Sequence, residues 1–295
     1  MKTNPVASVL DRNLTVAAAQ AETDKFVPIV EEAVNFGTTV YASVKPIVPS
    51  DMPQENDVPL LMYLHLLEMA DGVAELLRKG CVGATMPLTR TMFEAVLSLE
   101  YLLKDDFSRR ARAWMYTYAL EQLRSCKIAL GEDPEFVDAI ADDVAASQVD
   151  LSPAVRIAQT QKQTWIDYLN RPEFVEIATE YNSKGRYPKW HYLFGGPKSV
   201  AGLAKHLKRH AQYMVFYGYW SGVDHGTNPR RFEARTKSKD KVVRLVRDSA
   251  YMGSVGRVTA KLLHQASLFI VRQYRPSAES DVQKWWQQLQ PELGA

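Results

Sequence analysis

Apolar side chains recur every three or four positions along most of the chain, which is the spacing that places them on one face of an α-helix. The strongest patterns predict helices over residues 60–79, 85–104, 107–130 and 249–274. Weaker patterns predict one or two helices in residues 6–44, two or three in residues 134–181 and a last helix over residues 277–289. Pro28 is expected to interrupt the first of these regions or to begin its second helix. The predicted fold class is all-α, a single-domain multi-helix bundle.

A proline-rich connector divides this helical pattern. Residues 45–59 hold four prolines, each of which removes a backbone donor and disfavours a helix before it. We therefore expect an N-terminal helical extension with its connector over residues 1–58, a core bundle over residues 59–274 and a C-terminal helix within residues 275–295. The sequence shows no internal repeat and no convincing domain boundary, so we expect one domain over residues 1–295. Alternating apolar positions predict a short β-hairpin near residues 231–247.

The predicted helix over residues 85–104 is apolar on nearly all sides, which is typical of a buried central helix. Three polar residues on it, Arg90, Glu94 and Ser98, are spaced four positions apart, and we call such a series a ladder. Charged side chains are rarely buried without a partner. Either Arg90 and Glu94 pair with each other one helical turn apart, or they face a polar site formed with another helix.

A second ladder lies on the helix that we predict from residue 205 to a Gly-Thr-Asn-Pro stop at residues 226–229, with Ser199 as a plausible N-cap. Its polar members are spaced four residues apart: Arg209, Tyr213, Tyr217, Ser221 and His225. Successive members of such a series drift by about 40°, so they wind gently over one face. The flanking positions are apolar, and the two ladders together predict a polar site inside the bundle.

This site has a catalytic interpretation. His225 would be the general acid or base, because the unperturbed pKa of histidine lies near neutrality. Glu94 would orient His225 or act as the base, and Arg90 would hold an anionic group. Tyr217 and Ser221 complete the predicted catalytic set. The alternative is that both ladders are structural and fix helix packing.

An aromatic loop over residues 183–197 precedes the second ladder. It contains Trp190, and a loop this aromatic usually packs over a groove or closes a pocket. We expect it to cover the polar site, with Trp190 and Tyr213 contacting a ligand.

Charge and composition restrict the partners. The formal net charge of +2 gives no overall attraction to nucleic acid or membrane, so any such binding must be local. Residues 230–247 are the one basic concentration, and Arg230 and Arg231 begin it. This tract could bind RNA or a nucleotide through phosphate groups, or it could be a solvated loop. No apolar run reaches the length of a membrane span. With Cys81 and Cys126 isolated, we expect a cytoplasmic protein with reduced thiols.

Several chemistries lack their motifs. The chain has no glycine-rich phosphate loop and no Glu-x-x-His pair of a di-iron bundle. His206 and His210 are four residues apart, but no third ligand is evident and basic side chains surround them. We therefore expect no metal and no cofactor.

Arg257 and His264 are an alternative catalytic pair. An arginine followed by a histidine on one helical face resembles the HEPN ribonucleases (higher eukaryotes and prokaryotes nucleotide-binding), which are all-helical and usually cleave RNA across a dimer interface. The resemblance implies that the arginine stabilises phosphate charge and that the histidine supports attack by the 2′-hydroxyl. Val258 departs from the pattern, because a polar residue normally follows the arginine.

A broader resemblance covers residues 60–265. The central Arg90–Glu94 helix with Tyr101, the loop with Trp190 and the later helix with Tyr213, Tyr217, Ser221 and His225 resemble a widespread bacterial helical family that is catalogued only as a domain of unknown function. The resemblance implies the fold and the polar site but no activity. Members often look like accessory or defence-island proteins, which implies an antiphage defence context.

Three classes of function remain. The protein could be an enzyme on a phosphate-containing substrate such as RNA, in which case it is a metal-independent nuclease or hydrolase. It could be a non-catalytic, partner-binding bundle whose ladders fix helix packing. It could also be a small-molecule or nucleotide sensor, with the Trp190 loop as a lid. We expect a homodimer on general grounds, with Trp285 and Trp286 at its interface.

Overall fold

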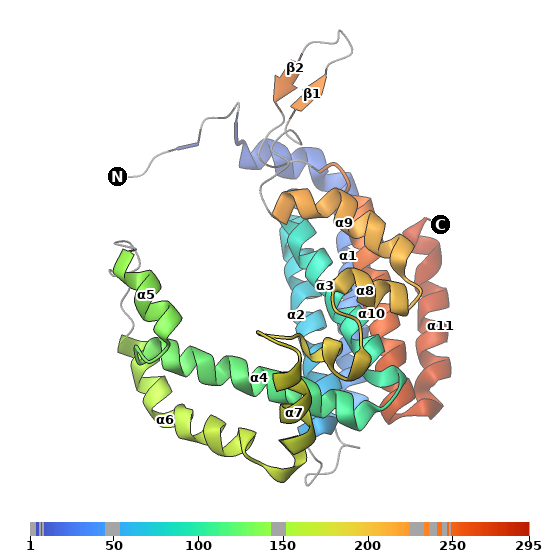
Figure 1. Ribbon diagram of the computed structural model, residues 1–295. Helices are drawn as coiled ribbons and strands as arrows, with labels where there is room; N and C mark the ends of the chain where they lie inside the picture. The colour runs from blue at the N-terminus through green and yellow to red at the C-terminus, as the bar shows by residue number, and fades with distance from the viewer. Residues whose placement is uncertain are drawn as a thin grey trace. The chain divides into compact units, whose positions relative to one another are not determined.

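A computed structural model describes residues 4–5, 7, 9–44, 54–142, 152–224, 233–235, 241–243, 247 and 249–294 of the chain. Within these residues the regular structure is helical apart from one pair of short strands (Figure 1). The prediction of an all-α helical bundle is therefore confirmed. None of the described helices is long and apolar enough to cross a membrane.

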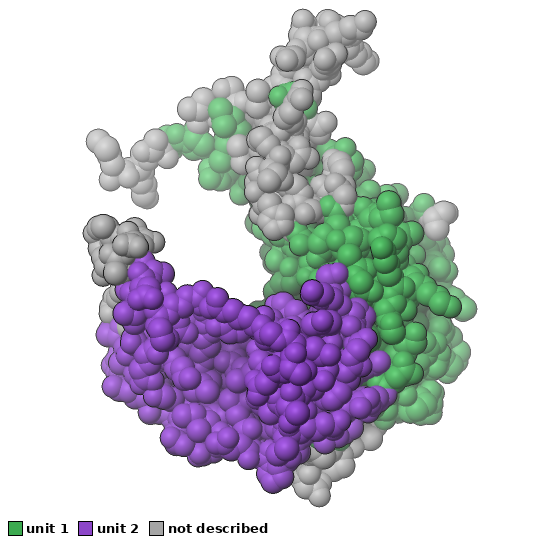
Figure 2. Space-filling model, viewed as in Figure 1, with its two compact units in different colours: residues 1–105, 200–295 green, residues 106–199 purple. Residues whose placement is uncertain are grey.

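The chain forms two compact units, which Figure 2 shows in different colours. Unit 1 combines residues 1–105 with residues 200–295, and unit 2 consists of residues 106–199. Two compact units can still belong to one cooperative domain, so the expectation of a single domain stays a prediction.

Unit 1 is a helical bundle in which α10 and α3 each pack against several other helices. Its helices are α1 (Arg12–Val44), η2 (Gln54–Asp57), α2 (Val58–Arg78), α3 (Val82–Lys104), α8 (Val200–His206), α9 (His210–Asp224), α10 (Met252–Tyr274), η7 (Pro276–Ala278), α11 (Glu279–Leu289) and η8 (Gln290–Leu293). Helix α10 packs against α1, α2, α3 and α11, and α3 also packs against α2, α8 and α9 (Figure 1). The two helices are buried on several sides, as the apolar pattern of α3 predicted.

Small residues allow α10 to lie close to α1. A Cβ atom added to Gly253 would lie 2.7 Å from Cζ of Phe26, and one added to Gly256 would lie 3.2 Å from the Phe26 Cβ. Phe26 is itself 3% exposed, so its ring has little room to move. The glycines of α10 therefore set the distance between these two helices.

Two expectations for unit 1 were wrong. Helix α1 continues through Pro28, because residues on both sides of the proline are buried and their packing outweighs one missing hydrogen bond. The helix expected from residue 205 is two helices, α8 and α9, separated by a turn at Lys208 with φ +59°. Ser199 therefore precedes α8 and does not begin the helix that carries the polar ladder.

The predicted hairpin is present. Strands β1 (Glu233–Arg235) and β2 (Lys241–Val243) pair antiparallel, with Ala234 opposite Val242. The residues that connect the two strands lie outside the described part of the chain.

Unit 2 contains α4 (Phe107–Ala129), α5 (Pro134–Asp142), α6 (Ser152–Leu169), η4 (Pro172–Phe174), α7 (Val175–Ser183) and η5 (Trp190–Gly195). Helix α4 packs against α6, α7 and η5. These elements share an apolar cluster that includes Tyr116, Tyr168, Phe174 and Ile177. The three α-helices described in residues 134–183 agree with the weaker sequence pattern there.

Candidate functional site: the polar seam between α3 and α9

The two predicted ladders meet where α3 packs against α9 in unit 1, and we call their contact region the polar seam. It comprises Arg90, Glu94 and Glu100 of α3 with Arg209, Tyr213 and Tyr217 on or next to α9. The Nε atom of Arg90 donates to Oε1 of Glu94 over 3.1 Å, and the phenol of Tyr217 donates to the same carboxylate oxygen. Arg90 and Glu94 thus pair with each other, and Glu94 also contacts Tyr217 of the second ladder. That they face a site holding His225 stays a prediction, because His225 lies outside the described residues.

Aromatic rings stack on one another and on Arg90 in this part of the seam. The guanidinium carbon of Arg90 lies 4.1 Å from the centre of the Tyr217 ring. Tyr217 stacks on Tyr213 with centroids 4.3 Å apart, and Tyr213 stacks on His210 at 5.9 Å. Phe93 of α3 also stacks on Phe216 of α9 at 4.5 Å, and both side chains are buried. The Arg90 side chain retains 15% exposure and that of Glu94 retains 35%.

The electrostatics of the seam keep Tyr217 in its neutral form. Burial raises the pKa of the Tyr217 phenol above its ordinary value, the hydrogen bond to Glu94 raises this pKa further, and Arg90 partly opposes both effects. The phenol therefore keeps its proton at neutral pH and acts as a donor to Glu94. It is poorly suited to accept a proton from a substrate.

A second polar contact lies further along the same pair of helices. Arg209 forms an ion pair with Glu100 of α3, and its Nη1 atom donates to Gln265 of α10 over 3.0 Å and to Gln212 over 3.2 Å. Arg209 is a member of the predicted ladder, whereas Glu100 and Gln265 were not predicted to belong to the site. Glu100 could have been noticed as a charged residue in the most apolar helix of the chain. It was missed because Glu100 does not share the four-residue spacing of Arg90 and Glu94.

Several predicted site residues cannot be placed in this geometry. Ser221 belongs to α9, one turn beyond Tyr217, and only its backbone is described. His225, Arg230 and Arg231 lie outside the described residues, as does most of the basic tract of residues 230–247. The catalytic roles of Ser221 and His225, and ligand binding by Arg230 and Arg231, stay predictions.

Trp190 belongs to unit 2, where it packs against the apolar cluster of that unit. Polar contacts with Glu180 hold other parts of its loop. Lys184 pairs with Glu180, and the backbone nitrogen of Phe194 donates to Glu180 over 2.7 Å. The expectation that Trp190 covers the polar seam and contacts a ligand stays a prediction.

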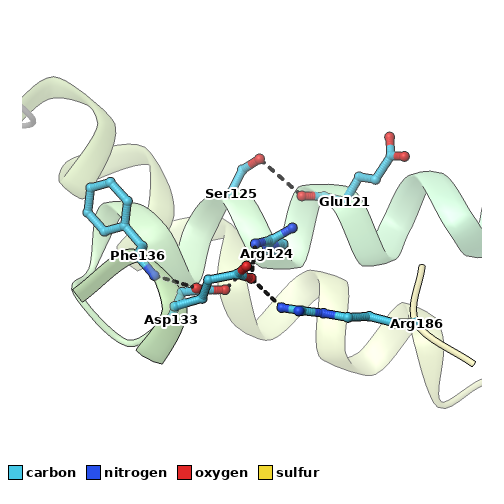
Figure 3. A network of polar contacts seen from close by, with 7 residues as sticks. Glu121, Arg124, Ser125, Asp133, Phe136 and Arg186 are labelled. Atoms are coloured by element: carbon cyan, nitrogen blue, oxygen red, sulfur yellow. Dashed lines mark hydrogen bonds and ion pairs between the residues drawn. The ribbon is translucent and has the colours of Figure 1, made fainter. Parts of the chain in front are cut away.

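Charged contacts also tie the loop to the start of α5. Figure 3 shows Arg124 of α4 and Arg186 of the loop beside the turn that carries Asp133. Arg124 pairs with Asp133 at 3.3 Å and with Glu135 at 2.9 Å, while Arg186 pairs with Glu135 at 2.5 Å. Asp133 also accepts a hydrogen bond from the backbone of Phe136 over 2.9 Å and so caps α5.

The alternative pair, Arg257 and His264, lies on α10 in unit 1. Seven residues are two helical turns, so the pair shares one face at an axial separation of about 10 Å. The His264 ring lies flat on Trp286 of α11, with centroids 4.3 Å apart. Its Nε2 atom is buried and has no hydrogen-bond partner in the described part of the chain.

Burial makes His264 a weak base. Desolvation lowers its pKa from 6.5 to about 4, and the charges of Lys261 and Arg272 act in the same direction. A general acid or base must come within hydrogen-bond reach of the substrate, and His264 is only 8% exposed. Ribonuclease chemistry at this pair would require α11 to move away, and it stays a prediction.

The histidines next to the polar seam pack against aromatic rings. His206 lies edge-on to Tyr101 at 5.5 Å, and His210 stacks on Tyr213. Among the residues that the structure describes, no three histidine, cysteine or acidic side chains gather in a group that could hold a metal ion.

Comparison with known proteins identifies the family but no activity. Neither a curated protein nor a solved structure matches the chain. Residues 56–241, which include α2, α3, all of unit 2, α9 and β1, match a family of unknown function, DUF5677. This match covers more than half of the chain and includes the helices that form the polar seam. The protein therefore belongs to the DUF5677 family.

Proposed function

We propose that the polar seam is a structural network that holds α9 on α3 and performs no catalysis, which favours the class of non-catalytic, partner-binding bundles. The observation that carries the proposal is the shared carboxylate of Glu94, which accepts hydrogen bonds from both Arg90 and Tyr217 while the Arg90 guanidinium lies on the Tyr217 ring. Three side chains from two helices thus satisfy one another. Such an arrangement fixes the register of a helix pair.

The chemistry of the seam supports this proposal. An anion could bind Arg90 closely only by competing with Glu94 and by disturbing the stack on Tyr217. Tyr217 keeps its proton, since burial and Glu94 raise its pKa. The neighbouring contact of Arg209 with Glu100 and Gln265 repeats the pattern, because charged and amide groups there also pair between helices.

A double-mutant cycle tests the proposal. Glu94→Gln and Tyr217→Phe should each lower the free energy of unfolding by about 1–3 kcal/mol, because the first removes the negative charge that pairs with Arg90 and the second removes one donor to the Glu94 carboxylate. The double variant should lose less than the sum of the two single losses, since the two side chains share one interaction. Chemical denaturation followed by tryptophan fluorescence measures all four proteins.

Glu22→Gln is the matched control. Glu22 is an exposed residue of α1, so the same change of charge there should leave stability within about 0.5 kcal/mol of wild type. If Glu94→Gln and Tyr217→Phe unfold like wild type but abolish a cellular phenotype, the seam is a functional site and our proposal is wrong. His225→Ala belongs in the same comparison, because the catalytic interpretation depends on it.

The more specific expectations stay predictions. They are RNA cleavage, a role in antiphage defence, a homodimer and RNA or nucleotide binding by the basic tract of residues 230–247. Each has a direct measurement: RNA degradation by the purified protein, phage plating efficiency, molecular mass in solution and the salt dependence of RNA binding.

A further inference from the structure

A cleft of about 330 Å³ is lined by residues of α10, α11 and η8 in unit 1, none of which belongs to the polar seam. It is lined by Arg257, Val258, Lys261, Trp286, Gln290 and Leu293. The lining thus combines two cations, an indole, an amide and two aliphatic side chains, with no acidic residue. Cavities that bind small organic molecules have volumes from about 300 Å³ upwards and a similar mixture of apolar walls and a few polar groups.

The two cations of the cleft lack carboxylate partners in the part of the chain that the structure describes. Arg257 lies over the Phe26 ring at 5.2 Å and makes a long hydrogen bond of 3.4 Å to the Leu293 carbonyl oxygen. Arg272, further along the same helix, does pair with Glu279 at 2.5 Å. Arg257 and Lys261 are one helical turn apart, so both side chains project from the same face of α10. The cleft is therefore positively charged.

The indole and the leucine of the lining are held in place. Trp286 is stacked on the buried His264 ring at an interplanar angle of 6°, which holds the indole in one orientation. Leu293, which also lines the cleft, is 6% exposed. An indole edge with Val258 and Leu293 offers apolar surface to a flat group, and the Gln290 amide can both donate and accept a hydrogen bond.

We propose that this cleft binds a small organic phosphate of the mononucleotide type. Arg257 and Lys261 bind the phosphate, and the apolar wall of Trp286, Val258 and Leu293 contacts the base or sugar. A phosphate monoester suits two cations better than a carboxylate does, because it carries up to two negative charges and three acceptor oxygens. This site goes beyond the structural role proposed for the polar seam and shares no residue with it, so either proposal can fail alone.

Isothermal titration of the full-length protein tests the site, with adenosine monophosphate as the probe and inorganic phosphate and adenosine as the comparison ligands. We expect adenosine monophosphate to bind about tenfold or more tightly than either, because only it offers both the charge and the flat apolar group. Its affinity should fall as salt is added, since two exposed cations supply much of the attraction.

Lys261→Gln is the informative variant because Lys261 is exposed and contributes little to the core. It should weaken binding of adenosine monophosphate about tenfold, as expected for loss of a hydrogen bond to a charged group. Lys284→Gln is the matched control, since it makes the same change of charge at an exposed position of α11 that does not line the cleft. Both variants should keep the melting temperature of wild type.

Four outcomes would overturn the proposal. They are no binding of adenosine monophosphate in the millimolar range, equal affinity for inorganic phosphate, unchanged affinity of Lys261→Gln, and binding of single-stranded RNA without binding of the mononucleotide. The second would reduce the site to a general anion site, and the last would assign the cleft to a polymer.

Discussion

The imidazole of His264 lies parallel to the indole of Trp286, with ring centroids 4.3 Å apart and planes 6° apart. The neighbouring Trp285 stacks on Phe36 of α1 at 4.1 Å and donates to Glu32 over 2.9 Å. Both tryptophans of α11 therefore contribute to packing inside unit 1. This role differs from the homodimer interface expected for them, which stays a prediction.

The buried His264 should make stability fall as the pH is lowered. Its pKa is lowered to about 4 in the folded protein, whereas an unfolded chain restores a value of 6.5. Between these two values the unfolded state binds a proton that the folded state does not, so the free energy of unfolding decreases from pH 6.5 to pH 4, by about 3 kcal/mol in total. Denaturation curves at a series of pH values measure this slope.

His264→Phe isolates that contribution, because phenylalanine preserves a ring on Trp286 but does not titrate. The variant should lose less stability than wild type between pH 6.5 and pH 4. His191 of unit 2 is also buried with a lowered pKa, but it is present in both proteins and cancels from the difference. Equal slopes in the two proteins would show that His264 does not remain neutral in the folded state.

Gly37→Ala should destabilise the contact between α1 and α2. A Cβ atom at this position would lie 2.5 Å from Cδ2 of Leu67 and 3.0 Å from the Tyr63 hydroxyl oxygen. Tyr63 is fully buried and bonded to Ser267 over 2.7 Å, so it cannot easily move. We expect a loss of about 1–3 kcal/mol, the usual result of overpacking.

Gly72→Ala provides the comparison for that variant in thermal and chemical unfolding. It adds the same methyl group within a helix, but the nearest atom would be Leu88 Cδ1 at an ordinary 3.5 Å. The gain in helix propensity, about 0.5–1 kcal/mol, should therefore make it neutral or stabilising. Equal effects of the two substitutions would contradict the close packing at Gly37.

Arg209→Ala should destabilise unit 1 by about 2–3 kcal/mol. The substitution removes the ion pair with Glu100 and the hydrogen bond to Gln265, and it leaves a partly buried carboxylate without its cation. Arg209→Lys keeps the charge but not the forked geometry, so it should lie between alanine and wild type. Equilibrium urea denaturation ranks the three proteins, and equal stability of all three would show that the contact contributes nothing.

Asp133→Ala should loosen the start of α5. The side chain of Asp133 accepts the Phe136 backbone N–H and pairs with Arg124, and both contacts lower its pKa. Loss of an N-cap should increase local opening about fivefold. Amide hydrogen exchange of residues 135–138 measures this opening, and Asp133→Asn should retain most of the protection because asparagine is also a good cap. Unchanged exchange in the alanine variant would contradict the capping role.

The helices of this protein could be predicted closely from the sequence. The helix predicted over residues 85–104 corresponds to α3, Val82–Lys104. The helix predicted over residues 249–274 corresponds to α10, Met252–Tyr274. The four-residue spacing of polar residues also singled out Glu94 and Tyr217, and the structure brings these two side chains into contact. Periodicity is informative in these cases because a helix repeats every few residues and its buried face must be apolar.

The errors arose where packing between distant segments outweighed a local signal. Pro28 disfavours a helix locally, yet α1 continues because it is buried on both sides of the proline. The turn at Lys208 has no glycine to indicate it, although it separates α8 from α9. A lysine can adopt this backbone conformation at moderate cost when the surrounding helices are held by their own cores.

The sequence by itself determined which segments are helical, which of their faces are apolar and where polar ladders interrupt those faces. Only the tertiary structure decided that Arg209 meets Glu100, 109 residues away, that His264 is buried under Trp286, and that Arg257 and Lys261 line a cleft. The physical reason is that the two kinds of interaction act over different separations along the chain. Helix formation depends on hydrogen bonds within four residues, whereas the partner of a side chain depends on which helices pack together and in which register.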